Sequence, residues 1–469
     1  MMTDMTGEET RTTMSPPIRS SAHDADLRPP VTRAWLTRVV IVGIVLTALN
    51  LRPAITSLGA LLEEVRDGLG MSGTAAGLLT SVPPLCFALF GVTAPRLARR
   101  FGPAAVVCAG MVAIAAGLVI RPFAGNTVGF LVASALALMG IAVSNVLMPV
   151  IVKRWFPDRV GSMTGLYSMA LALGTAAAAA VTVPMTRALG GSWQAGLAVW
   201  AGLAAVAVLP WIPLVRARGT ALSADTTSVK AQVQHSAPVQ STAQVQSTAQ
   251  VLTPASASDA PSVSAARVQE PPALRITRSR TAWALAVFFG LQATAAYITM
   301  GWMAQIFRDA GVPAGTAGLL LAVTMVMGVP LAFVIPRLAT RLPHQGPIVV
   351  ALGVCGLVGY AGLYLAPAGG AWAWAVLLGI ANCAFPLALT MVGMRARTGA
   401  GVAQLSAFAQ SMGYLISIPG PLLVGVLYQH SGGWGLPIAL MACLMVPQIV
   451  VGILAGRDRT VEDEAARRS

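Results

Sequence analysis

The sequence predicts an all-α membrane protein with twelve transmembrane helices arranged as two six-helix bundles. The 469-residue chain is 56% hydrophobic and only 10% charged, and its mean hydropathy is +0.72. A soluble domain would carry about 25% charged residues. Apolar runs of about 17–27 residues recur, which is long enough for a helix to cross a hydrocarbon core of about 30 Å. One long segment also occurs twice, which predicts two equivalent halves.

The repeated segment covers residues 66–100 and 308–341. With one deletion, 14 of the 34 aligned pairs are identical. Both copies begin with Arg-Asp, continue through Gly-Thr-Ala and Gly-Leu-Leu, and end with Pro-Arg-Leu-Ala-x-Arg. Two similar halves of a membrane protein usually enclose a shared pathway near the membrane midplane.

Helices are expected because lipid cannot satisfy backbone polar groups and because no run alternates as a barrel strand would. The predicted helices cover residues 36–62, 73–94, 103–121, 127–151, 161–186, 194–215, 281–305, 316–336, 347–366, 371–394, 401–427 and 435–456.

The predicted bundles cover residues 35–215 and 281–456, and a polar segment precedes each of them. The first 34 residues lack the apolar core and cleavage site of a signal peptide, and we expect a disordered tail. Residues 216–280 contain an exact tandem, 239–244 and 245–250, rich in Gln, Ser, Thr and Ala. Such a tract cannot bury enough apolar surface to fold, so it predicts a disordered linker. Residues 457–469 form a final tail.

The net charge of +14 is distributed as in a membrane protein rather than a nucleic-acid-binding one. Loops after the second, fourth, eighth and tenth helices hold ten basic residues, and the opposite loops hold only Arg66, Arg121, Arg187 and Arg308. The positive-inside rule therefore predicts that both termini are cytoplasmic, in a bacterial inner membrane. The chain offers no basic domain for nucleic acid, so the expected surroundings are a lipid bilayer and a small-molecule substrate.

Six helices, a linker and six similar helices in the same orientation resemble the major facilitator superfamily of secondary transporters. The loop at residues 95–102 fits that family's pattern, except that Arg99 replaces the usual aspartate. The resemblance implies gating-loop roles for Arg96, Arg100, Arg337 and Arg341.

A narrower resemblance starts at residues 49–59, which read LNLRPAITSLG. Residues 148–154 (MPVIVKR), 385–387 (FPL) and 407–414 (AFAQSMGY) support it. Together they are similar to the cyanate and 2-nitroimidazole transporter branch. The resemblance implies transport of small anions or small polar heteroaromatic compounds by alternating access, and leaves both the substrate and the direction open.

Arg52 is the strongest candidate for substrate binding, because it is the one charged residue well inside an apolar run. It lies about 15 Å from the end of its helix, too far for its side chain to reach water. Burial of a cation there costs at least about 2.5–3.5 kcal/mol. One reading is a cation that faces a wet cavity and offers its planar fork to the substrate. The other is a structural arginine bonded to carbonyls freed near Pro53.

Four amides accompany Arg52 in symmetric positions. The register of the repeat aligns Asn50 with Gln292 and Arg52 with Thr294, and two Asn-x-x-x-Pro motifs begin at Asn145 and Asn382. The superfamily resemblance implies that the first, fourth, seventh and tenth helices line a central cavity. The amides therefore converge on one site, or each simply bonds a neighbouring helix for about 0.6 kcal/mol.

Aromatic residues inside the runs are weaker candidates. Tyr297, Phe385 and Tyr414 stack on a flat substrate or simply pack in the core, and Gln410 is a further polar candidate. The five cysteines lack metal-ligand spacing, so no metal or cofactor is expected.

The residues inside the apolar runs distinguish between proton-coupled transport, other transport and catalysis. No Asp, Glu or His lies in the interior of any run, which predicts that proton coupling, if any, does not use a buried carboxylate. We expect a monomeric transporter rather than an enzyme, since the runs hold no nucleophile–base pair. The alternative within the same fold is a multidrug or metabolite exporter.

Overall fold

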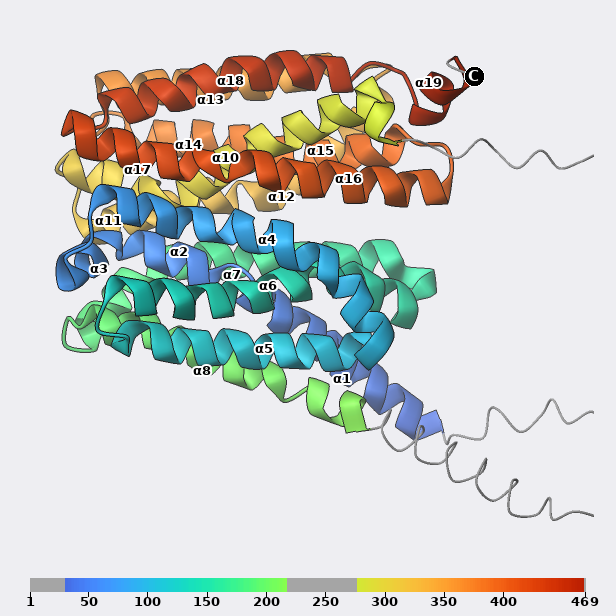
Figure 1. The fold of residues 1–469 in the computed structure, drawn as a ribbon, viewed down its shortest axis with the longest axis horizontal. Coiled ribbons are helices and arrows are strands. Elements are labelled where there is room, and N and C mark those ends of the chain that lie inside the picture. The colour runs from blue at the N-terminus through green and yellow to red at the C-terminus, as the bar shows by residue number, and fades with distance from the viewer. Residues whose placement is uncertain (1–29, 217–275, 468–469) are drawn as a thin grey trace, which may run out of the picture.

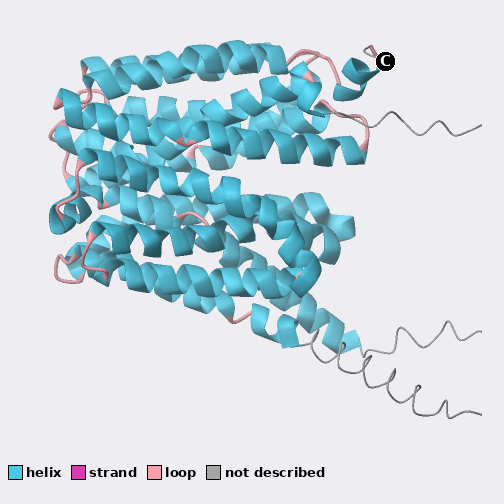
Figure 2. Cartoon of the chain, viewed as in Figure 1, coloured by secondary structure: helices cyan, strands magenta, loops and turns pink. Residues whose placement is uncertain are grey.

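The computed structural model describes residues 30–216 and 276–467 (Figure 1). The predicted disordered tail and linker lie almost wholly outside these residues. The described chain is built from helices and short loops and contains no strand (Figure 2). The N-terminal half contains α1 (Pro30–Asn50), α2 (Pro53–Ala60), α3 (Leu62–Leu69), α4 (Gly73–Phe101), α5 (Pro103–Ile120), α6 (Thr127–Trp155), α7 (Val160–Ala188) and α8 (Trp193–Val208). The C-terminal half contains α10 (Arg280–Asp309), α11 (Ala314–Val326), α12 (Gly328–Arg341), α13 (Gly346–Leu365), α14 (Ala371–Asn382), α15 (Ala384–Met394), α16 (Gly399–Ser417), α17 (Pro419–Ser431), α18 (Gly435–Ala455) and α19 (Val461–Ala466).

The predicted all-α membrane fold is confirmed. Within the described residues, 11 helical spans are long and apolar enough to cross a membrane, and Trp193–Val208 is a shorter apolar helix. That helix occupies the predicted run at 194–215, which is interrupted just before Pro210 because proline cannot supply the next backbone N–H. Trp211 follows, fully buried, with its indole N–H donating to Thr47 Oγ1 at 3.0 Å.

The helices form two bundles that lie side by side (Figure 1). One contains α1–α8 and the other α10–α18. We call the end where α1 begins and α18 ends the terminal side, and the opposite end, which includes α3, the far side. The ten basic loop residues noted above lie on the terminal side.

Four of the spans are broken near their middle. The breaks separate α1 from α2, α11 from α12, α14 from α15, and α16 from α17. Pro53 and Pro419 each begin the second helix of their pair, and Pro386 follows the third break closely. Proline is tolerated at the start of a helix because the N–H it lacks has no partner there. Residues at three of these breaks, Arg52, Gly328 and Cys383, line a cavity between the two bundles.

Contacts between the bundles gather on the far side. Gly73 and Gly77 of α4 pack directly against the backbone of α17 at Gly425. Trp302 donates its indole N–H to Thr80 Oγ1 at 3.2 Å. Small residues permit this close approach of two helices. The far side is therefore closed by direct backbone packing.

A cross-bundle ion pair strengthens this closure. Arg308 of α10 contacts Glu63 at 2.7 Å and Glu64 at 2.8 Å, both on α3. The two carboxylates are about one-third exposed, at 38% and 32%. Nothing in the local sequence around the two carboxylates indicates this arginine, which lies more than 240 residues away.

The last helix, α19, braces the terminal side of the C-terminal bundle. Glu464 accepts hydrogen bonds from the hydroxyls of Ser279 and Thr281, both at 2.7 Å, at the start of α10. Glu462 accepts from the backbone N–H of Thr398 at 3.3 Å, at the start of α16. Carboxylates are favourable at helix N-termini because the first N–H groups have no helical partner.

Candidate functional site

The break between α1 and α2 positions Arg52 in the middle of its span. α1 ends at Asn50 and α2 begins at Pro53, so Leu51 and Arg52 form the turn between them. The Arg52 carbonyl accepts from the N–H groups of Ile55 at 2.9 Å and Thr56 at 3.1 Å. The turn thus retains its backbone hydrogen bonds while the Arg52 side chain projects from the break.

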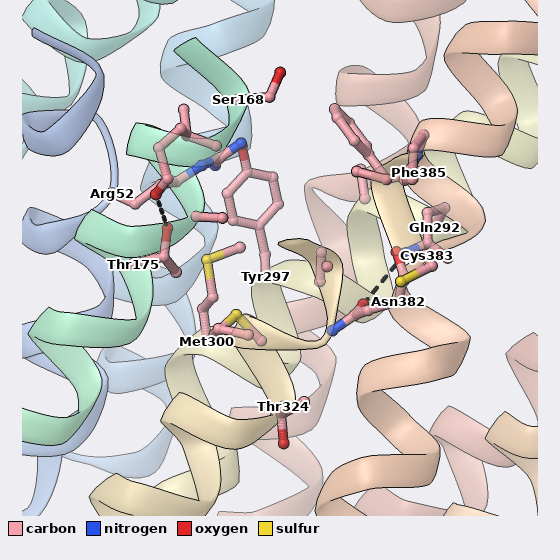
Figure 3. Close-up of a pocket in the computed structure, with 18 of the residues that line it drawn as sticks. Arg52, Ser168, Thr175, Gln292, Tyr297, Met300, Thr324, Asn382, Cys383 and Phe385 are labelled. Carbon is pink, nitrogen blue, oxygen red and sulfur yellow. Dashed lines mark hydrogen bonds between the residues drawn. The ribbon is translucent and has the colours of Figure 1, made fainter. Parts of the chain in front are cut away.

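Arg52 lines a cavity of about 240 Å³ between the two bundles (Figure 3). The other walls come from α7, α10, α11, α12, α14, α15 and α16. Among the described residues that line it, Arg52 is the only charged side chain. The described residues also contain no group of three or more His, Cys, Asp and Glu that could hold a metal ion.

Aromatic side chains surround the Arg52 guanidinium. It points toward the Tyr297 hydroxyl (Figure 3). Its Cζ lies 5.9 Å from the ring centroid of Phe87, and Phe87 in turn stacks on Tyr414 with centroids 5.0 Å apart. Cation–π contacts of this kind contribute about 0.5–2 kcal/mol. The aromatic shell holds the cation without neutralising its charge.

The facing wall carries a pair of amides. The Gln292 side chain donates to the backbone carbonyl of Asn382 at 3.0 Å and to Asn382 Oδ1 at 3.2 Å (Figure 3). The Asn382 carbonyl is available because Pro386, four residues later, has no N–H to donate to it. Gln448 of α18 donates to Gln292 Oε1 at 2.9 Å, which fixes the orientation of the pair.

The candidate residues from the sequence divide into two groups. Arg52, Gln292, Tyr297, Asn382, Phe385 and Tyr414 all line the cavity. Asn50, Asn145 and Gln410 are not among its lining residues.

Each residue outside the lining has another partner. The Asn50 amide donates to the carbonyls of Leu46 at 2.8 Å and Leu203 at 3.2 Å, so it joins α1 to α8. Asn145 Oδ1 accepts from the Tyr167 hydroxyl at 2.5 Å. Gln410 donates to Ser406 Oγ at 2.7 Å within its own helix.

Several contributors to the site were not predicted from the sequence. Gln448 is an amide inside the last apolar run, and this position could have identified it from the sequence as a candidate for the site. Phe87 carried no such signal, because a phenylalanine in an apolar run reads as core. Ser168 and Thr175 of α7 also line the cavity.

The four proposed gating arginines, Arg96, Arg100, Arg337 and Arg341, are all exposed on the terminal side. Arg96 donates to the Val92 carbonyl of its own helix at 3.4 Å, and the Arg100 guanidinium lies 5.1 Å from the Phe101 ring centroid. In the described part of the chain, none of the four forms an ion pair with the other bundle. The ion pair that joins the bundles is on the far side instead.

Comparisons with known proteins agree with this architecture. The sequence profile described as Major Facilitator Superfamily matches residues 40–403. An uncharacterized transporter, YycB of Bacillus subtilis (strain 168), is 33% identical over 93% of this chain and 96% of its own length. Two proteins of Escherichia coli (strain K12) are also similar. The 2-nitroimidazole transporter is 30% identical over 90% of this chain and 96% of its own, and the cyanate transport protein CynX is 28% identical over 88% and 96%.

Solved structures share the fold at low sequence identity. A point mutant of the nucleoside transporter NupG superimposes with a TM-score of 0.66 and 12% identity, over 90% of this chain and 99% of the other. A D-xylose-proton symporter superimposes with a TM-score of 0.63 and 13% identity, over 92% and 99%.

Proposed function

The chain belongs to the major facilitator superfamily, and on that premise we propose that it carries small anions or small polar heteroaromatic compounds across the membrane. The mechanism is alternating access, in which the two bundles rock around the central cavity and expose it to each side in turn. One polypeptide supplies the whole pathway, and we propose that it works as a monomer.

The observation that carries this proposal is the uncompensated charge of Arg52. No acidic side chain lines the cavity within the described residues. A buried cation costs at least about 2.5–3.5 kcal/mol in a membrane unless something pairs with it. A bound anion, or the electron-rich oxygen of a nitro group, supplies that partner, and the planar guanidinium binds two such oxygens side by side.

The size of the cavity favours a small substrate. Its volume of about 240 Å³ lies below the range of about 300–1,000 Å³ typical of sites for drug-sized ligands. Cyanate and 2-nitroimidazole, the compounds for which two of the relatives are named, are both small. With Arg52 on one wall and the Gln292–Asn382 pair on the other, a substrate is held by its charged or polar end and oriented by the amides.

The distribution of charge supports an orientation in a bacterial inner membrane. The basic loops lie on the terminal side, so the positive-inside rule makes that side cytoplasmic. With this orientation, the far side, where the bundles pack together, faces the outside.

Uptake by purified protein in liposomes tests the proposal, with radiolabelled cyanate and 2-nitroimidazole as separate substrates. Arg52→Ala should reduce kcat/KM by about ten- to a hundredfold, because a hydrogen bond to a charged group is worth about 1.5–3 kcal/mol. Arg52→Lys should restore uptake only partly, since lysine lacks the planar fork. The matched control is Arg38→Ala, which removes an exposed arginine from the same span. Normal uptake by Arg52→Ala would refute the site.

A further inference from the structure

Another arginine, Arg121, is buried between Arg52 and the far side of the protein. Arg121 follows α5 in the short helix Arg121–Phe123 and is only 1% exposed. It donates to the Ala54 carbonyl at 2.9 Å and to Ser57 Oγ at 3.5 Å. Those two residues follow Arg52 by about 3 and 7.5 Å along the helix axis. The contacts of Arg121 on α2 therefore lie about half a turn to one and a half turns beyond Arg52.

Arg121 lines a small cavity of its own, with a volume of about 20 Å³. Two polar atoms at this cavity, Arg121 Nε and Ser134 Oγ, are buried without a hydrogen-bond partner among the described residues. An unsatisfied buried polar group typically costs about 1–3 kcal/mol. No acidic side chain lines this cavity within the described chain either. The cavity thus combines an unneutralised cation with spare hydrogen-bonding capacity.

The walls of this cavity come from both bundles. Arg121 and Ser134 belong to the N-terminal bundle, whereas Tyr297 and Gly301 belong to α10. Gly301 packs closely on Thr80, so this wall moves when the bundles separate on the far side. At about 20 Å³ the closed cavity has room for roughly one water molecule. An anion of several atoms therefore requires the far side to be open.

Tyr297 lines both this cavity and the central one. It therefore contributes to the walls of both cavities, and its hydroxyl faces the Arg52 guanidinium (Figure 3). A substrate that enters from the far side meets Arg121 first and must pass Tyr297 to reach Arg52.

The repeat indicates that this charge belongs to one half alone. Residues 117–122 and 362–367 both read Gly-Leu, three further residues and Pro, which aligns Arg121 with Ala366. Arg52 likewise has an uncharged equivalent in the other half. Arg52 and Arg121 therefore both belong to the N-terminal bundle. Arg395, which is buried in the C-terminal bundle, is bonded instead to the Ala455 and Gly456 carbonyls.

We propose that Arg121 and Ser134 form a separate binding site for small monovalent anions, occupied when the far side is open. The site concentrates the anion next to Tyr297 and passes it to Arg52. The proposal rests on the alternating access described under the proposed function, because only a far-side-open state widens the cavity.

Charge-selective labelling of Ser134→Cys tests the proposal in full-length protein whose five native cysteines are replaced. Methanethiosulfonate reagents with a sulfonate or a trimethylammonium group are added to the far side of proteoliposomes. The measured quantity is the labelling rate with the anionic reagent divided by the rate with the cationic reagent, normalised to the same ratio for a free thiol. This normalised ratio should be at least about tenfold higher when Arg121 is present than in protein that also carries Arg121→Gln, which corresponds to about 1.4 kcal/mol. Arg121→Lys should keep the preference because it keeps the charge.

A second measurement leaves Arg121 intact and so does not depend on the folding of its variants. Thiocyanate should slow labelling of Ser134→Cys by the anionic reagent, and the larger gluconate ion at equal ionic strength should not. The matched control is Ser144→Cys on the same helix, whose hydroxyl is also buried without a described partner but lines neither cavity. It should show neither charge preference nor protection.

Two results would overturn the proposal: no labelling of Ser134→Cys from the far side, or labelling that is indifferent both to Arg121→Gln and to thiocyanate. A failure of the proposed substrate class is distinguishable, because the protein would then move neither cyanate nor 2-nitroimidazole while the labelling preference persisted.

Discussion

Substitution of Gly425 by alanine should open the far side of the protein. Gly425 of α17 faces α4 of the other bundle. A Cβ added there would lie 2.4 Å from the Gly73 carbonyl oxygen and 2.7 Å from the Gly77 Cα. Ordinary contacts begin at 3.4 Å, so the methyl group is about 1 Å too close to backbone atoms. Backbone cannot rotate away as a flexible side chain can, so the two helices must separate.

The magnitude follows from the cost of overpacking, which is typically about 1–3 kcal/mol. The clash is between bundles rather than within one, so it raises the free energy of the far-side-closed state and leaves each bundle intact. A change of this size corresponds to about a 5- to 150-fold shift in the ratio of closed to open protein. The far-side-open population should rise accordingly.

Spin-label distance measurements report this population directly. Leu189, at the end of α7, and Leu436, at the start of α18, are both exposed on the far side and belong to different bundles. Labels on cysteines at these two positions should give a longer distance component in Gly425→Ala than in the parent protein. Gly315→Ala is the matched control, because a Cβ added to this far-side helical glycine meets nothing within 4 Å.

An unchanged distance distribution in Gly425→Ala, in protein that remains folded and monodisperse, would refute the reasoning. A distribution that changes equally in Gly315→Ala would also refute it, since the effect would then come from the added methyl group in general rather than from the contact between α4 and α17.

Two further predictions concern charged groups outside the central cavity. Arg308→Gln removes the ion pairs with Glu63 and Glu64, each worth about 0.2–1 kcal/mol at this exposure. The same spin labels should therefore show a smaller far-side-open population than in Gly425→Ala. A larger population would contradict the conclusion that backbone packing contributes more to the closure than these ion pairs do. At α19, burial raises the pKa of Glu464 but hydrogen bonds from Thr281 and Ser279 outweigh it, so the pKa lies below its ordinary value of 4.5. The stabilisation by Glu464 is therefore present above pH 4.5 and lost as the pH falls through the lowered pKa. The Thr281 backbone N–H also donates to Glu464 Oε1 at 3.3 Å. Hydrogen exchange of this amide, corrected for its intrinsic rate, should accelerate over that acid range, and Glu464→Gln should already show fast exchange at pH 7. Equal protection in the variant would contradict the stabilising role of Glu464.

The local pattern of the sequence predicted the spans and the most informative site residue. Arg52 is recognisable because a charge inside an apolar run is costly wherever the helix points. Gln292 and Asn382 were matched by the repeat and by the Asn-x-x-x-Pro motif, and the structure brings their side chains together. These inferences need only composition and register, which a linear sequence contains.

Whether the other candidate residues face the cavity depends on how each helix is rotated about its axis. Asn50 has the same register as Gln292, yet its amide bonds α8 rather than facing the cavity. Asn145 has the same proline spacing as Asn382, yet it is bonded to Tyr167. A register fixes the depth of a residue in the membrane but not the direction of its side chain, which packing between helices decides.

The sequence alone determined that this is a two-bundle membrane protein with one arginine buried at mid-depth, because hydropathy and an internal repeat are properties of the linear chain. Only the tertiary structure decided which residues share that arginine's cavity, that Arg121 is also buried, and that Arg308 joins Glu63 and Glu64 across the bundles. Each of these involves residues distant in sequence, and their energies come from contacts that exist only once the two bundles have packed together.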